Sequence, residues 1–307
     1  MTDFLIGAGG WAYFQVPGLR SLETYANAFN FVEVNSTFYE IPNLRLVKSW
    51  RQRVPADFEF SVRCHKDVTH RFRLNPLTEA LSTFKVMMDI CRILQSKYMV
   101  LVTPPSLGFT REKIESIRDF FESFNLTGVR IVWEVRRRRG EPVPSSLISL
   151  MQEYSVIHCV DLSREESAID SSIVYTRVFG KGEHNIYQFT DEELMEIDER
   201  IISKESDTAI ISFHNVKMYK DAARYKIYKQ TKEFFPVTKA KGQQSLREVL
   251  MEDAEFPASK EELIWDQGWK VIDLTDDRRI HAHRLLEQLP DKRFRDIEEV
   301  MMNLLKI

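Results

Sequence analysis

The sequence has few cysteines and no long apolar run. Its three cysteines, Cys64, Cys91 and Cys159, have neither metal-site nor redox-motif spacing. We therefore expect buried thiols in a protein of the reducing cytoplasm. No apolar stretch approaches the ~20 residues that cross a bilayer, so no membrane association is expected. Residues 1–10 lack the charged and apolar parts of a signal peptide.

A strong excess of one charge is also missing. The formal net charge is −3, which argues against a uniformly basic nucleic-acid binder but leaves room for a local basic patch. The Gly7-Ala8-Gly9-Gly10 segment lacks the Lys-Ser/Thr of a phosphate-binding loop. Its glycines instead predict a tight turn that brings Trp11 and Tyr13 over a pocket. No Ser-His-Asp elbow and no zinc-type Cys/His signature is present.

Strand-like and helix-like stretches alternate along the chain up to about residue 235. Eight strands with interleaved amphipathic helices predict an α/β fold, a TIM-like (β/α)8 barrel. An open doubly wound sheet is the alternative, although it usually has fewer strands. The expected strands are 4–8, 31–35, 58–64, 98–102, 130–135, 156–161, 173–179 and 209–213.

Three of these strands end in a carboxylate, namely Glu33, Glu134 and Asp161. A charge at the end of a buried strand is costly unless it is paired or used. In a parallel barrel the carboxyl ends of all strands meet at one face, which carries the active site. Because side chains alternate along a strand, we can also assign the inward face. The residues expected inside are Glu33, Asn35, Glu59, Ser61, Arg63, Val132, Glu134, Arg136, Tyr175 and Arg177.

The alternation stops after Pro236. A polar stretch follows, and we expect a linker over residues 237–245. Residues 246–307 contain several short helical patterns and predict a small helical appendage. The expected domains are thus a barrel over 1–236, the linker, and the appendage.

Seven motifs follow one another within residues 4–230: Gly7–Tyr13, Val32–Pro42, Phe58–Arg63, Pro104-Pro105-Ser106, Glu134-Val135-Arg136, Tyr175–Gly180 and Phe213-His214-Asn215. With these motifs the chain resembles the DUF72 (YecE-like) family. This resemblance implies a TIM-like barrel and supplies no function. The tail segments 256–263 and 285–290 are similar to DUF2795, a small helical module of unknown role.

The carboxylates have two interpretations. In the first they hold a divalent metal, Mg, Mn or Zn, which activates water. In the second each carboxylate pairs with an inward arginine, so that charge is balanced without a metal. The metal ligands in the first case are Glu33, Glu134, Asp161 and His214; the cations in the second are Arg63, Arg136 and Arg177.

The arginines at the mouth also suggest an anion pocket, since guanidinium groups bind phosphate or carboxylate through two parallel hydrogen bonds. Nearby aromatic residues could stack a base or a sugar. A structural ion-pair network is the alternative. The predicted substrate-binding residues are Trp11, Tyr13, Asn35, Tyr39, Arg63, Lys66, Arg136, Arg177 and Asn215.

These patterns favour an enzyme, a hydrolase or lyase acting on a phosphorylated or nucleotide-like substrate. Glu33 and Glu134 would be the catalytic carboxylates and His70 the proton carrier, unless His70 only stabilises its loop. A barrel that binds an anionic small molecule without turnover is the first alternative. The second is a metal-dependent nuclease gripping nucleic acid through Arg136–Arg139. The oligomeric state stays open.

Overall fold

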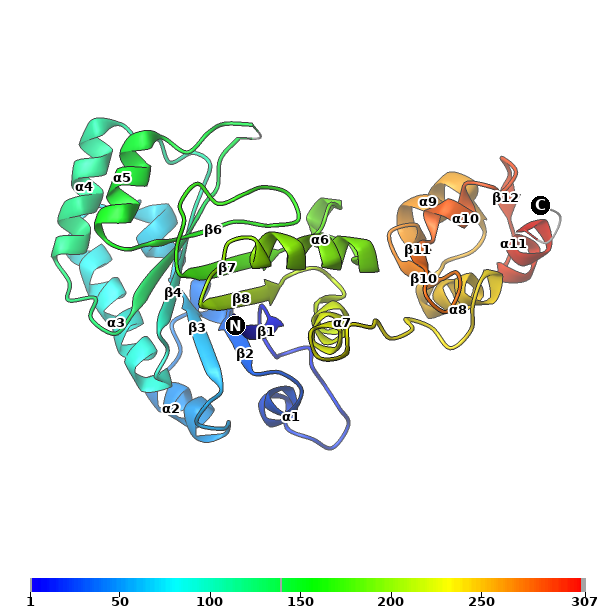
Figure 1. Cartoon of the computed structure of the whole chain (residues 1–307), viewed down its shortest axis with the longest axis horizontal. Coiled ribbons are helices and arrows are strands. Elements are labelled where there is room, and N and C mark those ends of the chain that lie inside the picture. The colour runs from blue at the N-terminus through cyan, green and yellow to red at the C-terminus, as the bar shows by residue number, and fades with distance from the viewer. Residues whose placement is uncertain (1, 139, 305–307) are drawn as a thin grey trace. The chain divides into compact units, whose positions relative to one another are not determined.

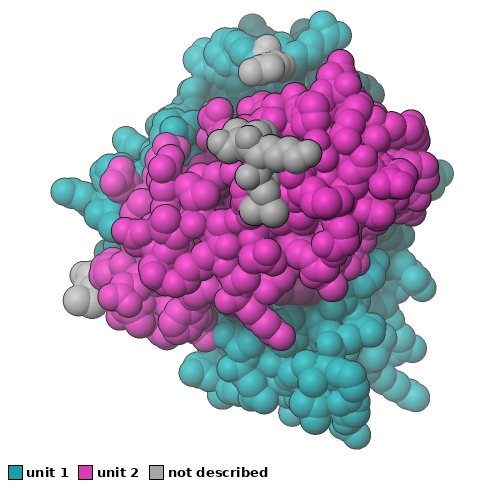
Figure 2. Space-filling model, turned by 90° about the vertical axis from the view of Figure 1, so that its right-hand side faces the viewer, with its two compact units in different colours: residues 1–178, 200–214 teal, residues 179–199, 215–307 magenta. Residues whose placement is uncertain are grey.

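The computed structural model describes residues 2–138 and 140–304. The chain divides into two compact units, which Figure 2 shows in different colours. Unit 1 comprises residues 1–178 and 200–214, and unit 2 comprises residues 179–199 and 215–307. None of the described helices is both long and apolar enough to span a membrane.

Unit 1 contains an eight-stranded, all-parallel sheet in the order β6-β5-β4-β3-β2-β1-β8-β7 (Figure 1). A parallel bridge between Val160 and Thr176 joins the two edge strands, so the sheet forms a nearly closed barrel. The predicted TIM-like fold is confirmed. The strands are β1 (Asp3–Ala8), β2 (Phe31–Val34), β3 (Glu59–Arg63), β4 (Tyr98–Thr103), β5 (Arg130–Val135), β6 (Ile157–Cys159), β7 (Ile173–Val178) and β8 (Thr208–Phe213).

The barrel interior is a buried apolar cluster. It includes Phe31, Val132 and Tyr175, and each of these residues has a charged neighbour two positions further along its strand. Because alternate residues of a strand share a face, these neighbours point to the same side near the carboxyl ends. Glu33, Glu134 and Arg177 therefore lie in one layer next to this apolar cluster, toward the carboxyl ends of the strands, as strand alternation predicts.

Helices between the strands enclose hydrophobic side chains on the other face of the sheet. The side chain of Asn43 accepts a hydrogen bond from the Arg45 amide at the start of α2, and Thr110 caps α4 in the same way. Helix α3 buries Phe84, Met88 and Cys91, which follow one another at the spacing of one helix face. The helices of unit 1 are α1 (Ser21–Ala28), η1 (Ser36–Phe38), α2 (Leu44–Gln52), η2 (Asp67–Arg71), α3 (Thr78–Leu94), α4 (Arg111–Glu122) and α5 (Ser145–Glu153).

Unit 2 begins directly after β7. It includes η3 (Glu183–Asn185), most of α6 (Asp191–Ile202) and α7 (Met218–Thr231). Thr190 and Glu193 form a reciprocal capping pair at the start of α6.

Residues 243–304 of unit 2, here called the C-terminal module, have their own apolar core around Leu246, Leu250 and Phe294. Helix α8 begins inside the expected linker, and the appendage is not purely helical because it contains two short antiparallel sheets. The module consists of α8 (Gln243–Asp253), β9 (Ala258–Ser259), α9 (Lys260–Gln267), β10 (Val271–Asp273), β11 (Arg279–His281), α10 (His283–Leu286), β12 (Arg293–Phe294) and α11 (Ile297–Leu304).

Candidate functional site

The guanidinium of Arg177 links two carboxylates at the carboxyl end of the barrel. Its Nη2 lies 3.0 Å from Glu33 Oε1, and its Nε donates to Glu33 Oε2 at 3.1 Å. Its Nη1 pairs with Glu134 Oε2. The other Glu134 oxygen accepts from Arg136 Nε at 2.7 Å. Strands β2, β5 and β7 thus converge on one buried cation.

The hydroxyl groups of Tyr175 and Ser61 form a hydrogen-bonded chain that leads to Glu33. The hydroxyl of Tyr175 donates to Glu33 Oε2 at 3.0 Å and lies 2.7 Å from Ser61 Oγ. Glu33 is fully buried and Arg177 is 1% exposed. Tyr175 is therefore a hydrogen-bonded support under the carboxylate, not an open stacking surface.

Neighbouring charges fix the ionisation states of these groups. Burial alone would raise the pKa of both carboxyls, but Arg177 outweighs it. The pKa of Glu33 falls well below its usual range, and that of Glu134 falls to about 2. Although burial opposes its charge, the two carboxylates raise the pKa of Arg177 above its ordinary value. All three groups are charged at neutral pH.

His214 borders the same network. Its Nε2 accepts from Arg177 Nε at 3.3 Å and lies 3.0 Å from Ser212 Oγ. Burial, reinforced by the Arg177 charge, lowers the pKa of His214 and keeps the ring neutral. A Cβ at Gly9 would lie 2.3 Å from the ring. Residue 9 must therefore be glycine for this ring position.

Arg63 is a buried cation without a carboxylate partner among the described residues. It is 6% exposed, its Nη1 donates to Asn35 Oδ1, and its guanidinium carbon lies 3.7 Å from the centre of the Phe38 ring. Its Nε is buried and has no hydrogen-bond partner. Burial and the nearby Arg177 lower the pKa of Arg63 to about 10, so it stays charged at neutral pH.

The charges of this cluster do not cancel. Two carboxylates, Glu33 and Glu134, face the three guanidinium groups of Arg63, Arg136 and Arg177. Since His214 is neutral, these five charged groups together carry one positive charge in excess. Among the described residues, Arg63 is the guanidinium of this set that has no carboxylate partner.

His70 lies beside this cationic group. Its ring packs edge-on against Phe38 at 5.1 Å, and its Nδ1 is 2.9 Å from Thr69 Oγ1. Partial burial, followed by the charges of Arg63 and Arg136, lowers its pKa. Phe38 is therefore shared between the Arg63 guanidinium and the His70 ring.

The predicted aromatic and basic loop residues are more exposed. Tyr13 is 83% exposed and Tyr39 is 62% exposed. Trp11 is half-buried and packs edge-on against Trp50 at 5.2 Å, whereas Lys66 is exposed. The ring of Tyr39 packs edge-on against Phe38 at 5.0 Å, which places Tyr39 beside the cluster.

Two predicted residues have other partners. Asp161 lies past the end of β6, where its Oδ1 accepts from the amide and hydroxyl of Ser163 and its Oδ2 lies 3.6 Å from Arg164. Asn215 belongs to unit 2, where its amide donates to Tyr187 O and to Asp221. Of the three predicted strand-end carboxylates, Glu33 and Glu134 share the Arg177 guanidinium.

The donor set does not suit a metal ion. Among the described residues, no three His, Cys, Asp or Glu side chains converge in a way that could hold one. Arg177 lies between Glu33 and Glu134, where a cation would have to bind. The predicted ligands Asp161 and His214 do not complete a metal site with them.

Two arginines of the run Arg136–Arg139 form ion pairs with glutamates. Arg137 Nη2 pairs with Glu165 at 2.6 Å and the side chain is 15% exposed, whereas Arg136 and Arg138 are exposed. Arg139 lies outside the described residues. The run therefore offers fewer unpaired charges to nucleic acid than its sequence suggests.

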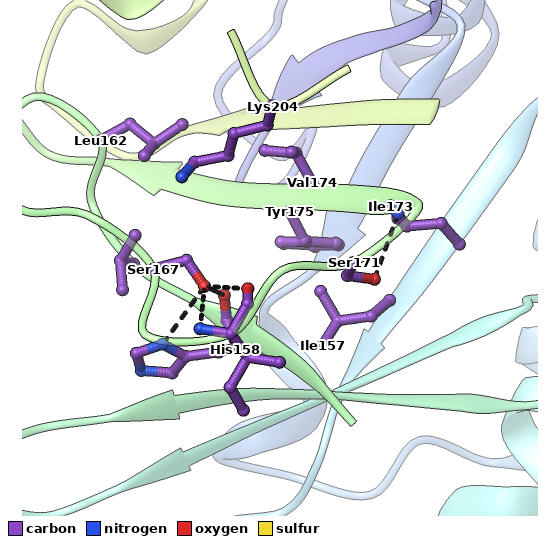
Figure 3. Close-up of a pocket in the computed structure, with 11 residues that line it drawn as sticks. Ile157, His158, Leu162, Ser167, Ser171, Ile173, Val174, Tyr175 and Lys204 are labelled. Atoms are coloured by element: carbon purple, nitrogen blue, oxygen red, sulfur yellow. Dashed lines mark hydrogen bonds between the residues drawn. The ribbon is translucent and has the colours of Figure 1, made fainter. Parts of the chain in front are cut away.

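A small second pocket opens in the barrel wall between β6 and β7 (Figure 3). His158 accepts the Ala168 amide at its Nδ1, and burial lowers its pKa to about 4. The ring of Tyr175 also lines this pocket, so the pocket reaches the residue that supports Glu33.

Phe38, Ser212 and Thr37 are site residues that the sequence reasoning missed. Thr37 Oγ1 donates to both Val34 O and Arg63 O, which joins the ends of β2 and β3. Phe38 and Thr37 lie in the Val32–Pro42 motif, which could have pointed to them. Ser212 lies beside Arg177 in the register of β7 and β8, and no sequence signal marks it.

Comparisons with known proteins place these residues in a family. A family model described as "Protein of unknown function DUF72" matches residues 5–234. UPF0759 protein YecE of Escherichia coli K12 is 34% identical over 72 residues, which are 24% of this chain and 26% of the relative. That match therefore spans only about a quarter of the curated relative.

Solved structures agree on the fold. A DUF72 family protein from Thermotoga maritima aligns with a TM-score of 0.62 and 19% identity, covering 74% of this chain and 99% of its own. A DUF72 family protein from Enterococcus faecalis aligns with a TM-score of 0.60 and 16% identity, covering 76% and 98%. At these identities the likeness shows the barrel and no activity.

Proposed function

This chain belongs to the DUF72 family, whose function is unknown, and we propose that its barrel is an enzyme for a phosphorylated or nucleotide-like small molecule. The observation that carries the proposal is Arg63, a buried guanidinium with an unpartnered Nε and no carboxylate partner among the described residues. A buried, incompletely satisfied cation is costly unless a ligand completes it. A phosphate or carboxylate group supplies the missing acceptors and the missing negative charge.

The residues divide into two roles. Arg63 and Arg136 bind the anion, with Asn35 orienting Arg63. His70 carries the proton, because its lowered pKa leaves a neutral imidazole beside two cations. When its Nδ1 donates to Thr69 Oγ1, its Nε2 is the atom that accepts a proton.

Glu33 and Glu134 are positioning residues in this proposal. Both are ionised, and both are already bound to Arg177. A carboxylate with so low a pKa is a weak base at neutral pH. The reaction class that fits is therefore proton transfer from an anionic substrate, as in a lyase, or from water, as in a hydrolase. The half-buried Trp11 and the exposed Tyr13, Tyr39 and Lys66 would contact the rest of the substrate.

Turnover assays on the full chain test this proposal. Sugar phosphates and nucleoside monophosphates are incubated with the protein, products are detected by phosphorus NMR, and binding is measured by calorimetry. We expect one class to be consumed. His70→Asn should lower the rate by about 10²–10⁴-fold and keep binding, whereas His283→Asn in the C-terminal module should change neither.

Each other outcome has a clear meaning. A compound that binds and is recovered unaltered favours the non-catalytic binding barrel. If no compound binds or reacts, the proposal is overturned. The similarity of the C-terminal segment to DUF2795 stays a prediction, since the family match ends at residue 234. The cytoplasmic location also stays a prediction.

A further inference from the structure

The C-terminal module forms one compact body with the chain that leaves β7 and β8. Unit 2 unites the module with residues 179–199 and with α7. Phe179 is the second residue after Arg177, and Asn215 directly follows His214. The boundary between the units therefore falls immediately after the two strands that carry these site residues, and not at the linker before the module.

A buried charge network holds this body together. Asp191, at the start of α6, accepts from Arg279 Nη1 at 2.8 Å through Oδ2, and its Oδ1 pairs with Arg224 of α7. The Arg279 Nε lies 2.9 Å from Asp273 Oδ1. Asp191, Arg224 and Arg279 are all buried. Removing one partner of such a network leaves a buried charge uncompensated, so each contact strongly restrains its neighbours.

Strands β10 and β11, which form an antiparallel pair, also bind the loop after β7 directly. Gln188 is 2% exposed, its Oε1 accepts the Val271 amide at 2.9 Å, and its carbonyl oxygen accepts from His281 Nε2 at 2.9 Å. The His281 ring lies 5.1 Å from the ring of Tyr187. Strands β10 and β11 therefore hold Tyr187 and Gln188 in place.

Tyr187 in turn closes the loop on itself. A Cβ at Gly180 would lie 2.3 Å from the Tyr187 ring, and Gly180 has a φ of +79°. The Tyr187 hydroxyl donates to Glu193 at 2.6 Å, and Glu193 also pairs with Lys181 at 2.9 Å. The two ends of residues 180–187 are thus held against each other and against the module.

We infer that the C-terminal module is a positioning element for the loop at residues 180–187, and that it acts through the side chains of Arg279 and His281. The module restrains the segment that continues from Arg177, so it fixes the loop at the carboxyl end of β7. Loops at this end of barrel strands surround the substrate. The consequence for substrate binding rests on the proposed function, whereas the restraint on the loop does not.

Hydrogen–deuterium exchange of the full chain tests the restraint without any ligand. In Arg279→Met, amides of residues 179–190 should exchange roughly tenfold faster, while amides of α8 keep their wild-type protection. The matched control is Arg278→Met, which removes the exposed neighbouring side chain and should change nothing. His281→Phe keeps the ring and removes one hydrogen bond, so it supplies a milder variant if Arg279→Met does not fold.

The outcomes separate this inference from the proposed function. Unchanged exchange at residues 179–190 in both Arg279→Met and His281→Phe overturns the positioning role. Arg279→Lys should restore most of the protection. Calorimetry with inorganic phosphate adds the link to the site: affinity should fall in Arg279→Met at equal folded fraction. If phosphate does not bind the wild type, the proposed function fails while the exchange result still stands.

Discussion

Arg177 Nη2 lies 3.0 Å from Glu33 Oε1 inside the barrel, with both side chains almost fully buried. This pair joins β7 to β2 across the carboxyl end of the barrel. Because Arg177 also pairs with Glu134, one cation organises the ends of three strands.

Glu33→Gln should destabilise the protein strongly. The variant keeps the shape of the side chain but removes the charge that compensates Arg177, which costs about 3–5 kcal/mol for a buried pair. Urea denaturation followed by circular dichroism measures the free energy of unfolding. The control is Asp89→Asn, which breaks the exposed pair with Arg92 and should have a much smaller effect. Equal effects of the two substitutions would contradict the buried-pair interpretation.

Stability should fall as the pH drops from about 4.5 to about 2. The pKa of Glu134 is lowered from 4.5 to about 2 in the folded protein. Its stabilisation is therefore complete above the unfolded pKa and is lost as the pH falls through the folded one, about 3 kcal/mol in total. Urea denaturation across this pH range should show a shallower dependence for Glu134→Gln. An identical pH dependence in both proteins would rule out this contribution.

The pKa of His70 should rise when Arg63 is neutralised. Burial and the charges of Arg63 and Arg136 lower this pKa below 6.5, so Arg63→Met should move it back toward that value. NMR titration of the imidazole protons gives the measurement. Arg71→Met removes an exposed arginine from the same segment and should leave the titration unchanged. A titration that does not respond to Arg63→Met would refute the electrostatic link between the two residues.

Gly9→Ala should displace the ring of His214. The added Cβ would lie 2.3 Å from ring atoms that are packed in the barrel, and such overpacking costs about 1–3 kcal/mol. Thermal denaturation and the NMR signals of His214 report the change. Gly108→Ala is the control, because nothing lies within 4 Å of its added Cβ. Wild-type stability and signals in Gly9→Ala would show that the ring position is not restricted.

The barrel and its inward-facing residues could be predicted because both follow from side-chain alternation. Glu33, Arg63, Glu134 and Arg177 lie on the predicted faces, and the structure brings them together. The strand expected over 156–161 is shorter in the structure, because β6 ends at Cys159 and Asp161 lies past its end. A three-residue strand is too short for its pattern to define where it stops.

Other features depend on distances that a sequence does not contain. Arg177 pairs with both carboxylates, whereas Arg63 has no carboxylate partner within residues 2–138 and 140–304. This difference depends on how far side chains reach across neighbouring strands. The two-residue strands of the C-terminal module have no alternation to detect. Asn215 belongs to a family-like motif, but its amide binds Tyr187 and Asp221 in unit 2.

Calorimetric titration of the full chain with inorganic phosphate, on the wild type and on Arg63→Met, tests whether Arg63 forms an anion site. We expect one phosphate per wild-type chain and an affinity at least about tenfold weaker in Arg63→Met, because a charged hydrogen-bonding partner is lost. Arg73→Met, which removes another arginine of unit 1, should bind like the wild type. Equal binding by the wild type and Arg63→Met, or none by the wild type, would contradict an anion site at Arg63.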